Sequence, residues 1–317
     1  MPFEKPVVAV VGAGAMGSLF GGLLGEGGLD VTLIDVWADH VAAINARGVR
    51  IVGVGGDRFV PVRAVTDARQ VKSADVVLFQ CKAFANEAAA TSVKHLFGGQ
   101  TAAITFQNGL GNEEQLAGIL GQEAVIGGLT AQGGLVEAPG VVRNFGELPT
   151  YIGELSGLLS DRAVAIAKAF SAHGLATTAT TEIKREKWKK LLGNVALGAI
   201  SALLNLRSFE IMSVPELQAT VFRLIDEAAA VASAEGIALD AQQAREVLMT
   251  LVDTKGGGTG ASKSSMCEDI LRRRPTEIDT IHGAVALRAR KHAIATPTLD
   301  SLIAMVKGLE SAYLKKE

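Results

Sequence analysis

The stretch Val7–Gly17 has the sequence VVAVVGAGAMG and decides the fold of the first half of the chain. Its first five residues form a continuous apolar run rich in valine, which is typical of a strand buried on both faces. The glycines that follow have the spacing G-x-G-x-x-G, and a helical pattern begins at Ala15. A glycine turn between a buried strand and a helix predicts a dinucleotide-binding site, because the helix N-terminus offers free N–H groups to a pyrophosphate.

Each glycine of this turn has a separate expected role. Gly12 permits the tight turn, Gly14 lets the backbone approach the pyrophosphate, and Gly17 allows close packing of helix on strand. Ala15 and Met16, in the first helical turn, are expected to contact the cofactor as well. The alternative is a glycine turn that binds no ligand. It is disfavoured because the strand, the helix and a downstream acidic residue all stand at the expected places.

That acidic residue is Asp35, which stands 18 residues after Gly17 at the end of the next apolar run, Val31–Ile34. A carboxylate here accepts hydrogen bonds from ribose hydroxyls and repels a 2′-phosphate. The sequence has no Arg or Lys between residues 30 and 46 that could offset this repulsion. NAD(H) is therefore favoured over NADP(H). Capping of the following helix is a second use of the same side chain, compatible with the first.

Apolar runs alternate with helical patterns through the first half of the chain. This alternation predicts an α/β Rossmann-type domain over residues 1–181, with a parallel sheet covered on both faces. A hairpin is expected around Gly55-Gly56-Asp57, and the Gly- and Pro-rich segment 133–153 is predicted to add antiparallel strands that close the sheet. After residue 181 strand-like runs cease, which predicts an all-α domain over residues 182–317. The expected helices cover 183–204, 215–235, 240–252, 264–272, 276–293 and 298–314, and 255–263 is expected to be a loop.

The bulk properties exclude several classes of protein. The net charge of −2 and the lack of long basic runs give no sign of a nucleic-acid-binding surface. Cys81 and Cys267 are too few for a disulfide framework, so a reduced, cytoplasmic setting is expected. The longest helical apolar stretch, 191–204, is too short to span a bilayer, and no membrane association is expected. No metal site is assigned.

The first expected helix of the second domain carries a row of polar residues on an otherwise apolar surface. The row falls on one face at helical spacing and consists of Lys190, Asn194, Gly198, Ser201 and Asn205. Buried polar groups cost free energy unless they are satisfied, so the row suggests the wall of a cleft. Lys190 can protonate a substrate carbonyl there, since partial burial lowers the pKa of a lysine. The open alternative is a surface Lys190, with Asn194 bonded to a neighbouring loop.

Two polar turns lie at the edge of the sheet where the glycine turn is expected. Lys82 follows the run Asp75–Phe79, and Asn108 follows the run Ala102–Phe106. Ligands of doubly wound sheets bind at the carboxyl ends of the strands. Each residue alone is more often a solvated turn residue, but two such turns at this edge favour a site.

These segments together resemble the ketopantoate reductase (2-dehydropantoate 2-reductase) family, from about residue 6 to residue 312. The resemblance is carried by VVGAGAMGSLFG, CKAF, QNGLGNEE, EKWKKLLGNVALGAISAL and SSMCEDILRRRPTEIDTIHG. It implies a C-terminal domain like that of 6-phosphogluconate dehydrogenase and reduction of a small 2-oxo acid with NAD(P)H in an interdomain cleft. A homodimer is a further expectation from the family.

The resemblance also implies roles for single residues. Lys190 matches the catalytic acid of the family, and Asn194 and Ser265 match residues that contact the substrate. Asn108 and Ser264 are predicted to lie at the substrate too. By themselves, serines at helix starts are typical of caps.

Three further positions match the cofactor side of the family's site. Lys82 and Asn108 match residues at the nicotinamide end, and Glu277 matches a residue that contacts the cofactor. From its pattern alone, Glu277 would be a surface position on a helix.

The chain departs from the family at two substrate-binding positions. Gly198 stands where a second asparagine is common, and Ser208 stands where a further asparagine is expected. Asp35 replaces the arginine of NADP-dependent members. Reduction of 2-dehydropantoate is the first prediction, and an NAD-dependent D-2-hydroxyacid dehydrogenase for branched or aromatic 2-oxo acids is the second. A dinucleotide sensor without turnover is a third, although a sensor would not need Lys190 aligned with Asn194.

Overall fold

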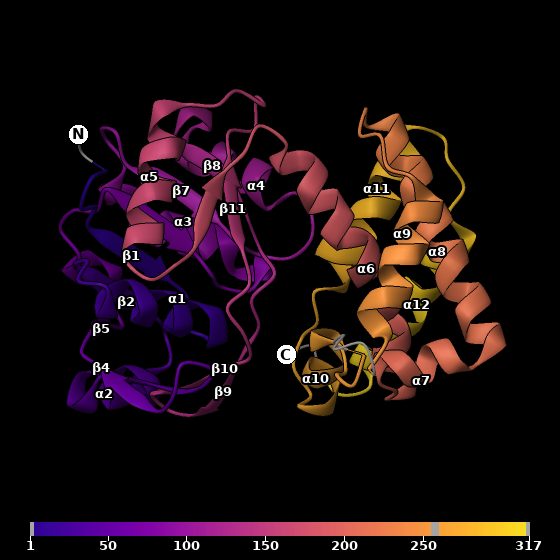
Figure 1. Cartoon of the computed structure of the whole chain (residues 1–317), viewed down its shortest axis with the longest axis horizontal. Helices are drawn as coiled ribbons and strands as arrows, with labels where there is room; N and C mark the ends of the chain where they lie inside the picture. Colours follow the sequence, from indigo (N-terminus) through magenta and orange to yellow (C-terminus); the bar gives the residue numbers. More distant parts are fainter. Residues whose placement is uncertain (1–2, 255–259, 315–317) are drawn as a thin grey trace. The chain divides into compact units, whose positions relative to one another are not determined.

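The computed structural model describes residues 3–254 and 260–314, and the chain divides into two compact units (Figure 1). One unit consists of Met1–Gln107 and Asn112–Ile183. The other consists of Lys184–Glu317 together with the short loop Asn108–Gly111. Residues 255–259 of the loop expected at 255–263 lie outside the described residues.

The first unit is built on an eight-stranded sheet with the order β12-β11-β8-β7-β6-β1-β2-β5. Its strands are β1 (Val8–Val11), β2 (Val31–Ile34), β5 (Arg63–Val65), β6 (Val76–Phe79), β7 (Ala102–Thr105), β8 (Val125–Thr130), β11 (Thr150–Gly153) and β12 (Thr177–Ala179). Strand β1 pairs in parallel with β2 on one side and with β6 on the other. The winding therefore changes direction at β1, and such a switch point is where doubly wound sheets bind ligands.

Helices cover both faces of this sheet, as the continuous apolar runs predicted (Figure 1). They are α1 (Ala15–Glu26), α2 (Ala38–Arg47), α3 (Asn86–Val93), α4 (Asn112–Leu120) and α5 (Asp161–Ala172), with short 3₁₀ turns η1 (Ala68–Gln70), η2 (Ala83–Ala85), η3 (Lys94–Leu96) and η4 (Gln122–Ala124). Successive side chains of β1 enter different cores. Val10 packs in the core that holds Phe20 of α1, and Val11 packs in the core that holds Val93 of α3.

A second, four-stranded sheet has the order β4-β3-β10-β9. Its strands are β3 (Val49–Gly53), β4 (Arg58–Val60), β9 (Gly134–Ala138) and β10 (Val141–Asn144). The hairpin predicted around Gly55-Gly56-Asp57 is confirmed as β3–β4.

The prediction for segment 133–153 was wrong in part. Only β11 joins the main sheet, antiparallel to β8. Strands β9 and β10 instead form a hairpin in which β10 pairs in parallel with β3. This pairing buries Val142 and Ile51 in the core beneath α1, and strand-like patterning alone cannot tell which sheet a hairpin will extend.

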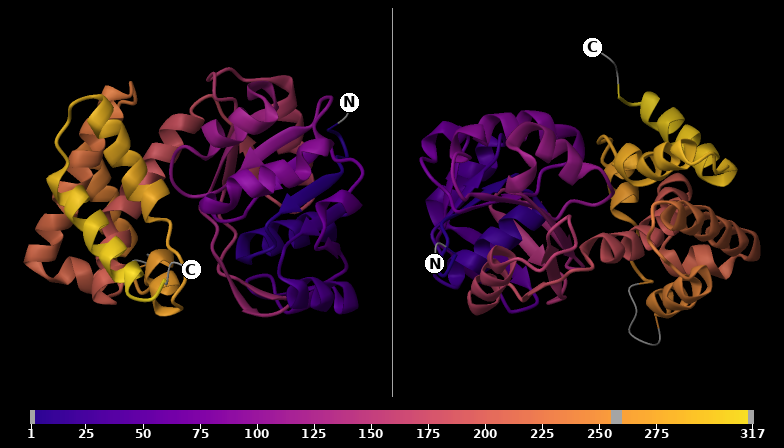
Figure 2. Two further views of the ribbon diagram at one scale, coloured as in Figure 1. Left: turned by 180° about the vertical axis from the view of Figure 1, so that it is seen from behind. Right: turned by 90° about the horizontal axis from the view of Figure 1, so that it is seen from above.

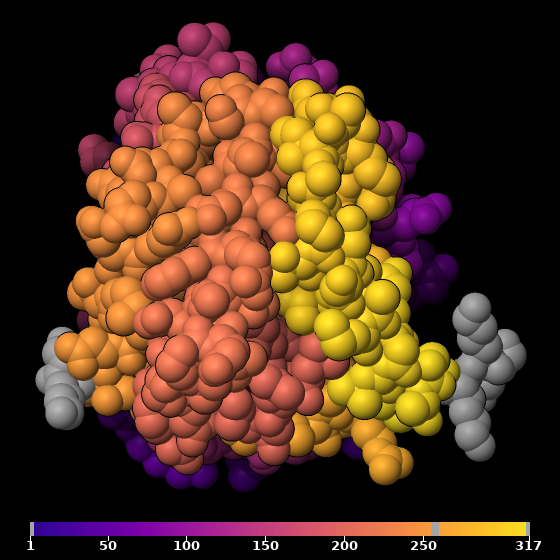
Figure 3. Space-filling model, turned by 90° about the vertical axis from the view of Figure 1, so that its right-hand side faces the viewer, coloured from indigo at the N-terminus to yellow at the C-terminus, as the bar shows by residue number. Residues whose placement is uncertain are grey.

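The described part of the second unit contains helices and no strands (Figure 2). Its helices are α6 (Ile183–Leu204), α7 (Ser208–Ser213), α8 (Pro215–Ala234), α9 (Ala241–Val252), α10 (Ser265–Leu271), the π-helix η5 (Asp279–Gly283), α11 (Ala284–Lys291) and α12 (Pro297–Ser311). Helix α6 is central, since Val195, Ala196 and Ala199 on it are wholly buried. Helices α8 and α12 lie side by side (Figure 3).

Two features of this unit differ from the helices expected. The segment 276–293 is not one α-helix, because the π-helix η5 precedes α11 and widens the turn. The short helix α7 lies in a stretch where no helix was expected. Within residues 3–254 and 260–314, no helix is long and apolar enough to cross a bilayer.

Candidate active site

The glycine turn follows β1, and two of its glycines have no room for a side chain. Gly12 has a φ of +93°, and a Cβ on it would lie 2.4 Å from the Cys81 backbone nitrogen. A Cβ on Gly17 would lie 1.8 Å from the carbonyl oxygen of Gly12. The turn is therefore pressed against the backbone after β6 on one side and against α1 on the other.

The third glycine of the turn lies in open space. A Cβ on Gly14 would have no atom of the described residues within 4 Å. Gly14 is the N-cap of α1, and no side chain within the described ranges caps this helix end. Ala15 and Met16, in the first turn, are half-buried. The uncapped N–H groups and the positive end of the helix dipole fit the pyrophosphate of a dinucleotide.

Asp35, at the end of β2, holds the turn in place. One carboxylate oxygen accepts a hydrogen bond of 2.6 Å from the Ala13 N–H, and the other accepts one of 2.9 Å from the Trp37 N–H. Each carboxylate oxygen keeps a further acceptor site, since an ionised carboxylate offers about four in all. Asp35 can therefore tie the turn to β2 and still accept hydrogen bonds from ribose hydroxyls.

His40 also supports the turn, and sequence reasoning missed it. The ring is wholly buried, and its Nδ1 accepts a hydrogen bond of 3.0 Å from the Gly140 N–H. The neutral ring therefore carries its proton on Nε2, which donates to Ser18 Oγ at 3.0 Å, and Ser18 donates to the Ala13 carbonyl at 2.6 Å. Burial lowers the pKa of His40, with Asp35 opposing this effect. No sequence signal joins His40 to Gly140, 100 residues away.

A network of buried amides fixes the turns after β6 and β7. The Gln107 amide donates to the Cys81 carbonyl at 2.6 Å and to Asn86 Oδ1 at 2.7 Å. Asn86 in turn donates to Asn112 Oδ1 at 3.0 Å. Lys82 follows Cys81 directly and is half-buried, so its position at the carboxyl edge of the sheet is set by this network.

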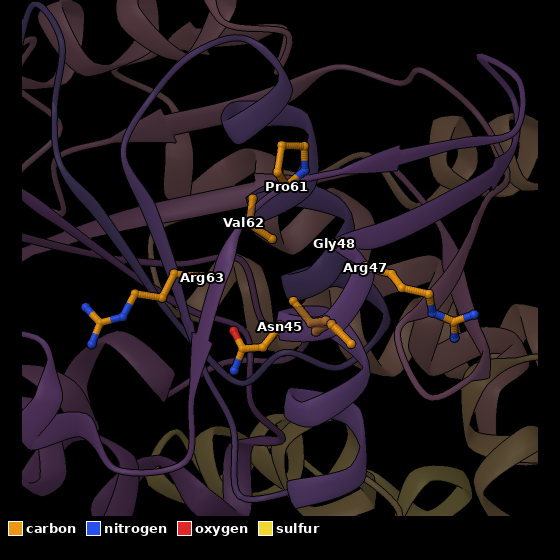
Figure 4. Close-up of a pocket in the computed structure, with 8 residues that line it drawn as sticks. Asn45, Arg47, Gly48, Pro61, Val62 and Arg63 are labelled. Atoms are coloured by element: carbon orange, nitrogen blue, oxygen red, sulfur yellow. The ribbon is translucent and has the colours of Figure 1, made fainter.

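A surface hollow of about 480 Å³ lies elsewhere in this unit (Figure 4). It lies between the end of α2, at Arg47, and the start of β5, at Arg63, and the two guanidinium groups point away from each other (Figure 4). Because β5 runs parallel to β2 and Arg63 begins it, the hollow lies at the amino edge of the sheet. Dinucleotides bind at the carboxyl edge, so the hollow is not the candidate site.

Lys190 of α6 is the centre of the second group of site residues. Its Nζ donates a hydrogen bond of 2.8 Å to Asn108 Oδ1. Burial lowers the pKa of Lys190 to about 8; the nearby charge of Lys187 adds to this effect and that of Glu277 opposes it. A lysine with a pKa near 8 is suited to general acid catalysis near neutral pH.

The loop that carries Asn108 is packed against the π-helix. Gly109 has a φ of +85°, and a Cβ on it would lie 2.1 Å from the Thr280 carbonyl oxygen. The Leu110 N–H donates to that same oxygen at 2.9 Å. This anchoring holds Asn108 against Lys190 although 82 residues separate them in the chain.

The residues of the polar row that follow Asn194 on α6 form hydrogen bonds with the segment around Ser264. Ser264 Oγ donates to the Gly198 carbonyl at 3.0 Å and accepts from the Cys267 N–H at 3.0 Å, as the N-cap of α10. Ser201 Oγ accepts from the Ser264 N–H at 3.1 Å. Asn205 lies beyond the end of α6, where its Oδ1 accepts from Lys263 at 2.6 Å. These contacts tie α10 to the second half of α6.

The comparisons with known proteins cover both units. The family model described as "Ketopantoate reductase PanE/ApbA" matches residues 8–157, and the model of its C-terminal part matches residues 182–310. The 2-dehydropantoate 2-reductase of Halobacterium salinarum is 34% identical over 304 residues, which cover 95% of this chain and 97% of that protein. The chain belongs to the ketopantoate reductase family. The resemblance predicted from the sequence is thereby confirmed.

Solved structures agree with the fold of this family. A PanE/ApbA family ketopantoate reductase from Ralstonia eutropha matches with a TM-score of 0.89 at 29% identity, over 97% of this chain and 99% of that one. A D-mandelate dehydrogenase, solved with NADH and anilino(oxo)acetate, matches with a TM-score of 0.91 at 27% identity, over 96% of this chain and 99% of that one. The predicted Rossmann-like unit followed by a helical unit is confirmed.

The residues implied by the ketopantoate reductase family fall into different places. Asn108 accepts a hydrogen bond from Lys190, and the charge of Glu277 raises the pKa of Lys190. Asn194 is half-buried on α6, one turn after Lys190. Ser265 is exposed at the start of α10. The remaining departure, Ser208, begins α7 and donates to the Ser262 carbonyl at 3.4 Å.

Proposed function

We propose that this protein reduces 2-dehydropantoate, a small 2-oxo acid, to the 2-hydroxy acid with a nicotinamide cofactor. The observation that supports this most directly is the Lys190–Asn108 pair with the lowered pKa of Lys190, in a chain of the ketopantoate reductase family. A lysine near its own pKa can donate a proton and regain it from water at neutral pH. The relatives named 2-dehydropantoate 2-reductase give the substrate.

In the proposed reaction, the Lys190 ammonium group donates a hydrogen bond to the C2 carbonyl oxygen of the substrate. When bound, the nicotinamide supplies the hydride that C2 accepts. Lys190 then passes its proton to the developing alkoxide, and the neutral amine takes another proton from water. Asn108 accepts a hydrogen bond from Nζ and so orients the amine, while Glu277 stabilises its charged form. Such proton transfer contributes about 10²–10⁴-fold to a rate.

The remaining predicted roles are part of this proposal. Residues 1–181 would bind the cofactor through the glycine turn, and residues 182–317 would carry the catalytic lysine. Asn194 and Ser265 would orient polar groups of the substrate, and Lys82 would lie at the nicotinamide end. Ser264 would act through α10, because its hydroxyl already bonds Gly198 and Cys267. A homodimer stays a prediction from the family, and a cytoplasmic location stays a prediction from the low number of cysteines.

A second candidate is an NAD-dependent dehydrogenase of aromatic or branched 2-hydroxy acids. The likeness to D-mandelate dehydrogenase and the loss of an amide at Gly198 favour it. A panel of 2-oxo acids distinguishes the candidates by the rate of NADH and NADPH oxidation. We expect the highest kcat/KM for 2-dehydropantoate. A higher kcat/KM for phenylglyoxylate or 3-methyl-2-oxobutanoate would favour the second candidate. Tight cofactor binding without turnover of any acid would favour a sensor.

We further propose that NAD(H) is the preferred cofactor. Asp35 is placed by the Ala13 and Trp37 N–H groups at the end of β2, where its charge would repel a 2′-phosphate. The neighbouring His40 does not offset this charge, because burial lowers its pKa and favours the neutral ring. The D-mandelate dehydrogenase with the matching fold was solved with NADH.

Asp35→Asn tests this preference. The amide keeps one oxygen acceptor for a backbone N–H and removes the negative charge. We expect the ratio of kcat/KM for NADH to kcat/KM for NADPH to fall at least tenfold, which corresponds to about 1.4 kcal/mol. Asp39→Asn is the matched control, because Asp39 is exposed on the first turn of α2 and carries the same charge. An unchanged ratio in Asp35→Asn would refute the role of this carboxylate.

A further inference from the structure

The π-helix η5 places an unsatisfied histidine against the central helix α6. His282 is wholly buried, and its Nε2 lies 3.0 Å from the Val195 carbonyl oxygen. Its Nδ1 has no hydrogen-bond partner among the described residues. Burial lowers the pKa of His282 to about 4, so the ring is neutral at physiological pH. Since a carbonyl oxygen only accepts, the proton is on Nε2, and Nδ1 is a buried acceptor.

An unsatisfied acceptor in a buried position is costly. Leaving such a group without a donor costs about 1–3 kcal/mol, and the great majority of buried polar groups are paired. π-helical turns are rare and are frequently found at functional sites. His282 combines both features within five residues of Glu277, whose charge acts on Lys190. The missing donor is therefore expected from a molecule that binds here.

The ring of His282 lies beside Gly198, a buried position on α6 that carries no side chain. Apart from its two chain neighbours and the nearby backbone of α6, a Cβ on Gly198 would have one atom of the described residues within 4 Å, His282 Cε1 at 3.5 Å. Cε1 is bonded to both ring nitrogens, so the gap left by the missing side chain lies one bond away from the acceptor Nδ1 as well as from Nε2. Gly198 is also the third member of the row formed with Lys190 and Asn194. Along one face of α6 the substrate would meet a proton donor at Lys190, an amide at Asn194 and then the ring of His282 beside Gly198.

We propose that His282 selects the substrate, with Nδ1 accepting a hydrogen bond from a hydroxyl group on the side chain of the 2-oxo acid. This inference rests on the proposed function and extends it, because it names the residue that distinguishes a hydroxylated 2-oxo acid from an aliphatic or aromatic one. A site built around such a bond rejects an analogue without the hydroxyl, because the acceptor is then left unpaired.

Two substrates that differ by a single oxygen test this proposal. 2-Dehydropantoate and 3,3-dimethyl-2-oxobutanoate have the same carbon skeleton around C2 and C3, and only the first carries a terminal hydroxyl. For the wild-type enzyme we expect kcat/KM to be at least about 100-fold higher for the hydroxylated acid. Equal values for the two acids would overturn the role of His282 and leave 2-oxo acid reduction standing. Failure to reduce any 2-oxo acid would overturn both proposals.

Two variants of His282 test the roles of its two ring nitrogens separately. His282→Gln keeps an amide that can reach the Val195 carbonyl in place of Nε2 and removes the acceptor at the Nδ1 position. His282→Asn places an amide oxygen near the Nδ1 position and loses the contact with Val195. We expect the preference for the hydroxylated acid to fall tenfold or more in His282→Gln and to persist in His282→Asn. The reverse order would show that the ring only supports α6.

A measurement on the wild-type protein covers the case in which the variants fold poorly. The five histidines of the chain can be labelled with ¹⁵N, and their ring nitrogens observed by NMR in the unreactive complex with NAD⁺ and a 2-oxo acid. An unprotonated ring nitrogen shifts when it accepts a hydrogen bond. We expect 2-dehydropantoate, but not 3,3-dimethyl-2-oxobutanoate, to move the Nδ1 signal of His282. The same shift with both acids, or with neither, would overturn the proposal.

Discussion

Lys190→Met is expected to lower kcat for 2-oxo acid reduction by about 10²–10⁴-fold, the usual contribution of a general acid. Methionine keeps an unbranched side chain of similar length but cannot donate a proton or bond Asn108. Lys189→Met is the matched control, because Lys189 is exposed and its ammonium group pairs with Glu186 at 2.7 Å. The control should keep its kcat within about twofold. A loss below tenfold in Lys190→Met would exclude the general-acid role.

The pH dependence gives the same lysine a second test. Reduction needs the protonated amine, so kcat/KM should be constant below pH 8 and fall above it, where Lys190 with its pKa of about 8 loses the proton. Oxidation of the 2-hydroxy acid needs the neutral amine, so its kcat/KM should rise up to about the same pH and then level off. Lys187→Met removes a charge that repels the Lys190 ammonium group. It should therefore raise the pKa of Lys190 and move both pH transitions to higher pH. Glu277→Gln removes a charge that attracts the ammonium group, so it should lower the pKa of Lys190 and move both transitions to lower pH.

The parts of the fold that the sequence predicted are those with local signals. A strand, a glycine turn and a helix are adjacent in Val7–Gly17, and apolar periodicity marks α6, α8 and α12. The partner of β10 has no local signal, because the apolar pattern that buries Val142 does not specify which strand lies beside it. The π-helix could not be predicted either, because apolar periodicity assumes a constant number of residues per helical turn.

The same distinction applies to the candidate site. Lys190 and Asn194 could be found because they share one helix face, and Asn108 because it follows a strand at the carboxyl edge of the sheet. That Asn108 bonds Lys190 follows only from the packing of Gly109 on Thr280.

The histidines His40 and His282 could not be found in this way. Their decisive partners lie 100 and 87 residues away along the chain. Their importance comes from complete burial and from which ring nitrogen is satisfied, and both of these are properties of the folded chain.

Gly17→Ala is expected to abolish cofactor binding and to destabilise the first unit. Its Cβ would stand 1.8 Å from the Gly12 carbonyl oxygen, and neither group is the end of a flexible side chain. Helix α1 must then move away from β1, which opens the turn and costs about 1–3 kcal/mol of unfolding free energy. We expect the Kd for NADH to rise more than about 100-fold, measured by fluorescence titration, with a lower melting temperature in the same sample.

Gly14→Ala, in the same turn, is expected to weaken NADH binding without changing the stability of the fold. Its Cβ would meet no described atom within 4 Å, so the stability of the free protein should change by less than about 0.5 kcal/mol. The methyl group would nevertheless stand where the backbone must approach the pyrophosphate, so the Kd for NADH should rise about tenfold or more. Gly118→Ala, at an equally open position in α4, is the control and should bind NADH normally. If Gly14→Ala also binds normally, the pyrophosphate does not lie against Gly14, and the assignment of the glycine turn must be abandoned.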